Sequence, residues 1–273
     1  MKEWFSAIGQ WIADAFTRGG FAHRVLGLPE LASTNGQAVD NLMVYVHWLM
    51  LVLFIGWIIY FGYVLFRFSA ARNKKASYEG SKSKVPSYVE LAIVGIEAVL
   101  LLGVAVPLWA KNVGHFPTPE ESTVIQIVAQ QFNWNARYPG LDGKFGHQDM
   151  KLVADNNVFG VDPADPAGKD DVQVLNEIHV VLNKPVLIYL SSKDVIHSLK
   201  LVAMRITQDA IPGLRIPCTF TPTKIGRYQI ECAQLCGNGH AAMAGGFIVV
   251  QSPTDFEAWL KSKSGSAAPA SFE

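Results

Sequence analysis

Two long apolar segments come first in the pattern of hydrophobic and polar residues. Residues 42–66 contain no charged residue and a single histidine, His47, and residues 88–110 form a second apolar run that includes Glu90 and Glu97. As α-helices, which rise ~1.5 Å per residue, both runs are long enough to cross a hydrocarbon layer of ~30 Å. The pattern therefore predicts a transmembrane helical hairpin over residues 41–111, with spans at about 42–66 and 88–110.

The connector between the two spans is strongly basic. It holds one acidic residue, Glu79, and six basic ones: Arg67, Arg72, Lys74, Lys75, Lys82 and Lys84. Because cytoplasmic connectors of membrane proteins carry an excess of Lys and Arg, we expect this one on the cytoplasmic side. Both termini and the part after the second span are then expected on the periplasmic side of a bacterial inner membrane, or its equivalent.

From residue 112 onward, short apolar runs alternate with turn residues, as is typical of β-strands. Residues 131–138 alternate strictly, which places Phe132, Trp134, Ala136 and Tyr138 on one face of a strand. Further strands are predicted at 123–129, 177–182, 185–190, 200–204, 225–230 and 246–251. The predicted fold class is a membrane-anchored all-β protein, in which a two-helix transmembrane hairpin precedes a cupredoxin-like Greek-key β-barrel over residues 112–262.

The two ends of the chain differ from the segments between them. Residues 1–40 are predicted to be an N-terminal amphipathic segment, because apolar residues recur at helical spacing over residues 1–21. The membrane interface and a partner subunit are equally suited to cover its apolar face. A short helix is expected over residues 254–261 and a flexible tail over 263–273. The acidic, proline-rich run 162–171 is expected to be an unordered surface loop without function.

Composition narrows the functional classes. The formal net charge is zero, which gives no reason to expect a nucleic acid partner. Three cysteines, Cys218, Cys232 and Cys236, are an odd number for a disulfide framework, so metal or redox use of the closely spaced pair is favoured. A disulfide or two buried thiols remain the alternatives for that pair. Cys218 is expected to be a lone buried thiol.

Four donor side chains are concentrated in residues 232–243, namely Cys232, Cys236, His240 and Met243. Thiolate and thioether sulfur suit copper, whereas structural zinc sites use Cys and His and rarely Met. The spacing would also fit one face of an α-helix, but the run Gly237-Asn238-Gly239 costs about 2 kcal/mol of helix propensity. We therefore predict a folded-back copper-binding loop between two strands. His197, between two predicted strands, is the candidate for a further ligand.

This loop, Cys-x-x-x-Cys-Gly-x-x-His-x-x-Met, with His197-Ser198 upstream, resembles subunit II of haem-copper cytochrome c oxidases, where it carries the dinuclear CuA centre. Gln131-Phe-Asn-Trp134, Tyr138 and Asp209-Ala-Ile-Pro-Gly213 are further landmarks, so the resemblance covers roughly residues 40–260. It implies two copper ions held by six residues: His197 and His240 as imidazole ligands, Cys232 and Cys236 as bridging thiolates, Met243 as an axial ligand, and Gln234 through its backbone carbonyl.

The resemblance also implies a function, that of the subunit through which electrons enter a respiratory terminal oxidase, a proton-translocating oxidoreductase. A cytochrome c-type donor, external or bound in a larger assembly, would supply the electrons. Haem in the catalytic subunit I would receive them and reduce oxygen to water, and further oxidase subunits are expected as partners. No Cys-x-x-Cys-His haem attachment sequence occurs, so the donor is expected to be a separate protein or subunit.

Four more residues have roles implied by their positions in the family. Phe132 stands where many members have the Trp that receives electrons, and with Trp134 it is predicted to lie where electrons enter; core packing is the alternative for Trp134. Glu90 matches a Glu near the entrance of a proton channel of the catalytic subunit. Gln234 replaces a Glu that helps to hold magnesium at the interface with that subunit. An amide is a weaker ligand for this hard cation, so magnesium is expected to bind weakly or not at all.

The surface near the predicted copper site is expected to be poor in acidic residues. Lys193 and Arg137 lie close to it in the sequence, and residues 112–273 carry thirteen Lys and Arg against sixteen Asp and Glu, a net charge of minus three. A basic donor would therefore be steered only weakly towards this surface.

Three other classes of protein fit the sequence less well. Quinol oxidase subunits of similar fold lack the copper ligands. A membrane-tethered copper chaperone with a Cys-x-x-x-Cys pair leaves His240, Met243 and the second span without a purpose. A mononuclear blue-copper carrier gives no reason for the second cysteine.

Overall fold

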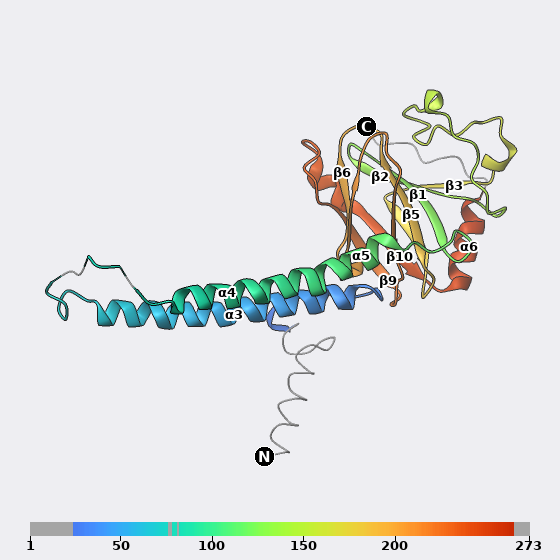
Figure 1. The fold of residues 1–273 in the computed structure, drawn as a ribbon. Coiled ribbons are helices and arrows are strands. Elements are labelled where there is room, and N and C mark those ends of the chain that lie inside the picture. Colours follow the sequence, from blue (N-terminus) through green and yellow to red (C-terminus); the bar gives the residue numbers. More distant parts are fainter. Residues whose placement is uncertain (1–23, 76–77, 81, 265–273) are drawn as a thin grey trace, which may run out of the picture. The chain divides into compact units, whose positions relative to one another are not determined.

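The computed structural model describes residues 24–75, 78–80 and 82–264, and the fold is drawn in Figure 1. The amphipathic helix predicted within residues 1–21 and most of the predicted tail lie outside the described residues. The chain divides into two compact units. One contains residues 38–111, and the other contains residues 29–37 together with the chain from residue 112 onward. Each unit is described separately.

The helical unit consists of two long apolar helices (Figure 1). The first is α3, Gly36–Arg67; the second runs continuously through α4, Val85–Ala98, the π-helix Val99–Ala105, and α5, Val106–Gly114. Their mean hydropathies are 2.4 and 2.5, and neither apolar window is buried in the chain itself. Both helices are long and apolar enough to cross a membrane, which confirms the two predicted apolar helices at the N-terminal side.

The π-helical turns stand immediately before a proline in the second helix. Pro107 has no N–H to donate, and in an α-helix its ring would clash with the carbonyl of Gly103. A wider turn before the proline is one way to relieve that clash without ending the helix. The helix therefore continues to Gly114 instead of stopping near Pro107.

Within the residues that the structure describes, the β unit is built from ten strands in two five-stranded sheets. The sheet orders are β3-β2-β1-β5-β8 and β4-β10-β9-β6-β7. Most neighbours are antiparallel, but β1 pairs with β5 and β10 with β4 in parallel. The strands are β1 Thr123–Gln130, β2 Asn133–Tyr138, β3 Val172–Leu175, β4 Glu177–Val181, β5 Val186–Ser192, β6 His197–Leu201, β7 Ile206–Ala210, β8 Ile216–Phe220, β9 Gly226–Cys232 and β10 Gly246–Gln251. This architecture confirms the predicted all-β, cupredoxin-like fold class.

The core lies between the two sheets and follows the alternation of the strands. Ile125 and Ile127 of β1, Ile188 of β5 and Ile230 of β9 are fully buried. Trp134, Ala136 and Tyr138 of β2 are buried on one face, as the strict alternation of residues 131–138 predicted. Many of the core residues are β-branched or aromatic, which favours strands. Cys218 is buried and free, as expected.

The prediction that residues 162–171 form an unordered loop is wrong. Asp171 accepts hydrogen bonds from the Arg137 guanidinium, with Nε–Oδ2 at 3.0 Å, and Asp165 accepts from the backbone N–H of Ala167. Arg137, expected at the surface, is completely buried. Carboxylates therefore order this segment where apolar residues are scarce. The prediction counted only apolar residues and missed these paired groups.

Two peripheral elements complete the β unit. In residues 29–37, Ala32 donates its N–H to Ala203 and accepts from Thr223, a contact that the pattern did not predict. The helix α6, Pro253–Lys263, begins at the Ser252 cap, whose side chain accepts from the Asp255 N–H. Figure 1 shows α6 beside the sheets.

Candidate metal centre

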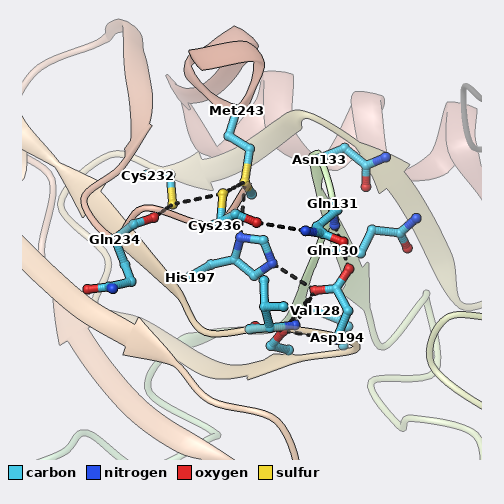
Figure 2. Close-up of polar contacts among 12 residues, drawn as sticks. Val128, Gln130, Gln131, Asn133, Asp194, His197, Cys232, Gln234, Cys236 and Met243 are labelled. Atoms are coloured by element: carbon cyan, nitrogen blue, oxygen red, sulfur yellow. Dashed lines mark hydrogen bonds and ion pairs between the residues drawn. The ribbon is translucent and has the colours of Figure 1, made fainter. Parts of the chain in front are cut away.

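The candidate ligands converge from two segments of the β unit (Figure 2). His197 is the first residue of β6, and Cys232 is the last residue of β9. The connection from β9 to β10 supplies the rest. It folds back at Gly237, whose φ of +137° suits glycine, and a 3₁₀-helix, His240–Gly245, then leads into β10. The connection is thus a folded-back loop and not one α-helix.

Their donor atoms lie within a few ångströms of one another. The two cysteine Sγ atoms are 3.9 Å apart, and the Cys236 Sγ lies 3.5 Å from both the Met243 Sδ and the His240 Nδ1. The His197 Nδ1 is 3.1 Å from the Met243 Sδ. The backbone carbonyl oxygen of Gln234 is 3.1 Å from the Cys232 Sγ. The structure therefore brings all six predicted ligands together.

These separations fit metal coordination. With bonds of 2.0–2.3 Å, two N or S ligands of one tetrahedral ion lie about 3.3–3.8 Å apart. One donor atom each of His197, Cys232 and Cys236 also falls within 4.8 Å of the other two. A sulfur separation of 3.9 Å excludes a disulfide in this structure, since S–S bonds are about 2.05 Å long. A set of two thiols, two imidazoles and a thioether suits copper better than zinc.

The site is half enclosed by the barrel. His197 and Met243 have no exposed surface and Cys236 is buried, whereas Cys232 and His240 are half-buried. Burial, with a smaller contribution from the neighbouring Cys232, raises the pKa of Cys236 to about 11. At neutral pH this thiol therefore needs a bound cation to ionise, as expected for a metal ligand that exchanges a proton for the metal.

Asp194 orients the imidazole of His197. Its Oδ1 lies 2.8 Å from the His197 Nε2, and because a carboxylate only accepts, Nε2 carries the proton and Nδ1 keeps its lone pair for a metal. Burial favours the protonated form of Asp194, but hydrogen bonds from the Gln131 N–H, His197 and the Val195 N–H outweigh it and hold its pKa below the usual value. This role of Asp194 was not predicted from the sequence, although the residue stands three positions before His197.

Trp134 and Phe132 occupy different positions beside the site. Trp134 is fully buried and donates from Nε1 to the Met243 carbonyl at 3.0 Å, so it belongs to the core and supports the ligand loop. Phe132 is half-buried, and its ring lies so close to Gly237 and Gly239 that a Cβ at either position would crowd it. Of the two residues predicted where electrons enter, only Phe132 reaches the surface.

The Gln234 side chain and Glu90 are not part of the donor cluster. Gln234 is an exposed residue, and only its backbone carbonyl approaches a cysteine. Glu90 is an exposed residue of α4 in the helical unit. Glu97, on the same helix, is exposed as well.

The comparisons with known proteins agree with the cupredoxin-like fold of the β unit. Residues 123–252 match the family described as "Cytochrome C oxidase subunit II, periplasmic domain". The chain is 30% identical over 231 residues to the alternative cytochrome c oxidase subunit 2 of Bradyrhizobium diazoefficiens, covering 84% of this chain and 81% of the relative. It is 30% identical to the probable cytochrome c oxidase subunit 2 of Rickettsia felis, covering 80% of this chain and 64% of the relative.

A similar solved structure is the periplasmic domain of subunit II of cytochrome oxidase from Bradyrhizobium japonicum. It is 28% identical, covers 55% of this chain and 96% of that domain, and has a TM-score of 0.40.

Fold and site thus define a membrane-anchored protein with a periplasmic domain and a cluster of copper-type ligands. The chain belongs to the cytochrome c oxidase subunit II family, whose members are subunits of haem-copper oxidases.

Proposed function

We propose that this chain is the subunit through which electrons enter a respiratory terminal oxidase, by way of a dinuclear CuA centre in its β unit. The observation that carries the proposal is the convergence of Cys232 and Cys236 with His197, His240 and Met243 within 3.1–3.9 Å contacts. One copper needs only one thiolate of this set, so the second cysteine favours a bridged pair.

Each ligand would have a distinct role. Cys232 and Cys236 would bridge two copper ions, His197 and His240 would each bind through Nδ1, and Met243 and the Gln234 carbonyl would complete the set. Bound copper would supply a reversible one-electron change shared between two ions. The protein holds the ligands on strand ends and on a loop whose Cys236 and Met243 are buried, which keeps geometric change on electron transfer small.

Electrons would reach this centre across the surface near Phe132. Its half-buried ring packs on Gly237 and Gly239 of the ligand loop. Three exposed apolar residues lie close in sequence to the candidate ligands: Val195, Ile196 and Leu235. A cytochrome c-type donor, external or bound in a larger assembly, would contact this surface. The buried Trp134 would act through the ligand loop and not as the point of contact.

The partner that receives the electrons would be the haem-bearing subunit I. In the helical unit, Glu90 would lie at the entrance of a proton channel of that subunit, a role that rests on its position in the family. We also propose the boundaries 1–40, 41–111, 112–262 and 263–273, with both termini on the periplasmic side.

The proposal is tested by loading the full-length chain with copper and recording its EPR spectrum. A mixed-valence pair gives seven hyperfine lines and two copper ions per chain. Four lines and one copper per chain at saturation would instead indicate a mononuclear carrier or a copper chaperone, and would overturn the proposal.

A further inference from the structure

Gln131 links the two segments that carry the candidate ligands (Figure 2). Its side-chain Nε2 donates to the carbonyl of Cys236 at 2.7 Å, and its backbone N–H donates to the Asp194 Oδ2 at 2.7 Å. The other oxygen of Asp194 accepts from His197 at 2.8 Å. Three connections, β1–β2, β5–β6 and β9–β10, are thereby joined through one residue.

The residues that contact the Gln131 amide leave room for its hydrogen bond to the Cys236 carbonyl. A Cβ on Gly237 would lie 2.8 Å from the Gln131 Nε2, so a residue with a side chain at 237 would displace the amide. The acceptor belongs to Cys236, which is buried and contacts three other candidate ligands. A shift of this carbonyl would move the cysteine sulfur that lies at the middle of the donor set.

We propose that Gln131 is a positioning residue of the metal centre, which fixes Cys236 relative to His197 through its amide and its backbone N–H. The inference rests on the proposed copper function. It assigns to Gln131 a role that the ligand motif does not include, since Gln131 supplies no metal ligand. Partners of this kind, beyond the ligands themselves, typically change metal affinity by about 10–100-fold when they are removed.

The test compares three variants of the full-length, copper-loaded chain. Gln131→Met removes the amide donor and keeps a similar length, and Gln131→Glu keeps the shape but places a carboxylate, which cannot donate, against the Cys236 carbonyl. Gln229→Met is the matched control, because the Gln229 Nε2 also donates to a carbonyl of the same connection, that of Ala244 at 2.8 Å. Gln229 makes its contact at the far end of the connection, away from the cysteines.

Two readouts separate positioning from general stability. Copper release into excess chelator should be about 10–100-fold faster in both Gln131 variants than in the unaltered chain, with altered copper hyperfine splitting. Gln229→Met should release copper at close to the unaltered rate. Thermal unfolding of the metal-free chains should change by similar amounts in Gln131→Met and Gln229→Met.

Two results would overturn the inference. One is an unaltered release rate and spectrum in Gln131→Glu, because that variant has lost the donor. The other is an equal acceleration in Gln229→Met, because that would make the effect one of general loosening. Failure of the proposed function is recognised separately, as the absence of a two-copper spectrum in the unaltered chain. If Gln131→Met does not fold, the isosteric Gln131→Glu variant still decides the question.

Discussion

Cys236 and Met243 both offer sulfur to the candidate centre, but with different chemistry. A thiolate can bridge two ions, whereas a thioether is a neutral, weak ligand. Cys236→Ser should therefore lower the copper content below two per chain and abolish the seven-line spectrum. Met243→Leu, a change of similar volume that typically costs less than ~1.5 kcal/mol of stability, should keep two copper ions with a shifted reduction potential. Metal analysis and redox titration check both outcomes, and a seven-line spectrum in Cys236→Ser would contradict the bridging role.

Two roles are predicted for Gln234: its backbone carbonyl would bind copper, and its side chain stands where the family has a magnesium ligand. Its carbonyl faces the Cys232 sulfur at 3.1 Å, while the residue itself is exposed and offers only a neutral amide. We expect normal copper content but little magnesium in the purified oxidase, and a gain of magnesium in Gln234→Glu, since carboxylates bind this hard cation better. Elemental analysis of both complexes measures this. Full magnesium occupancy in the unaltered complex would show that the amide suffices.

The residues around the centre differ in how far the sequence predicts them. His197 was predictable because the sequence placed it near a strand end, where the structure has the first residue of β6, and because it belongs to a recognisable motif. Gln131 was not, because its contacts with Asp194 and Cys236 span 63 and 105 positions of the chain. Asp194 lies only three residues before His197, but no pattern in the sequence shows that its carboxylate accepts from that imidazole. Periodicity reports which face of a strand a residue occupies. It carries no information on which distant carbonyl that residue meets.

The helix α6 is attached to the barrel by aromatic contacts that include a histidine. Trp259 stacks on His179 at 4.0 Å, and His179 also bonds to Gln251. Burial lowers the pKa of His179 from its ordinary value. Because the folded state disfavours the proton, its contribution to stability is complete above the unfolded pKa of ~6.5 and is lost as the pH falls through the lowered value.

We therefore expect the thermal unfolding temperature to fall between pH 7.5 and pH 5, and to fall less in His179→Phe, which keeps a ring against Trp259. The measurement is a series of unfolding curves at several pH values. An identical pH dependence in His179→Phe would show that other groups account for it.

The second apolar helix carries one carboxylate well inside its span. Glu97 is exposed in the chain alone, and a charge near the middle of a membrane costs about 2.5–3.5 kcal/mol on insertion scales. We expect Glu97 to contact a neighbouring subunit through a hydrogen bond. Glu97→Gln should then assemble normally, while Glu97→Leu should lower the amount of this chain that copurifies with the oxidase. Val99→Leu is the control, and normal assembly of Glu97→Leu would indicate a lipid-facing residue.

Elements with clear apolar runs were predicted, and several short strands were not. The strand predicted at 200–204 lies instead at His197–Leu201, and Val202–Met204 forms a 3₁₀-helix. Both apolar helices and β1, β2, β5 and β10 follow clear runs in the sequence. β3, β7 and β8 are strands of four or five residues that were not predicted. Their extended conformation depends on pairing with β2, β6 and β5, respectively. The parallel pairings of β1 with β5 and β10 with β4 are likewise tertiary, since no local pattern encodes a partner strand.

The charge of the whole molecule determines how a donor would approach. The region from residue 112 onward has a formal net charge of minus three. The two basic residues predicted near the site, Arg137 and Lys193, are both paired with carboxylates. Arg137 is buried with Asp171, and Lys193 pairs with the exposed Asp155. The prediction from the sequence was therefore wrong about Arg137, which is buried and contributes nothing to the exposed field.

The ligand segments themselves present a neutral, partly apolar surface. Residues 232–251 contain no Asp, Glu, Lys or Arg, and Leu235 is 78% exposed. Asp194 faces His197, and Glu231 pairs with Lys200 at 3.2 Å. Steering by charge acts over ~8–10 Å at ordinary salt and needs a surface field of one sign, which these pairs do not provide.

Turnover of the complete oxidase with its own donor should therefore change by less than about threefold between low and moderate ionic strength. Leu235→Ser should weaken the reaction at every salt concentration, because contact would depend on apolar burial and not on long-range attraction. Leu214→Ser, at a leucine outside the ligand segments that is 51% exposed, is the control. Steady-state rates over a salt series provide the measurement. A steep loss of rate with added salt, together with no effect of Leu235→Ser, would show that an acidic docking surface elsewhere on the complex directs the donor.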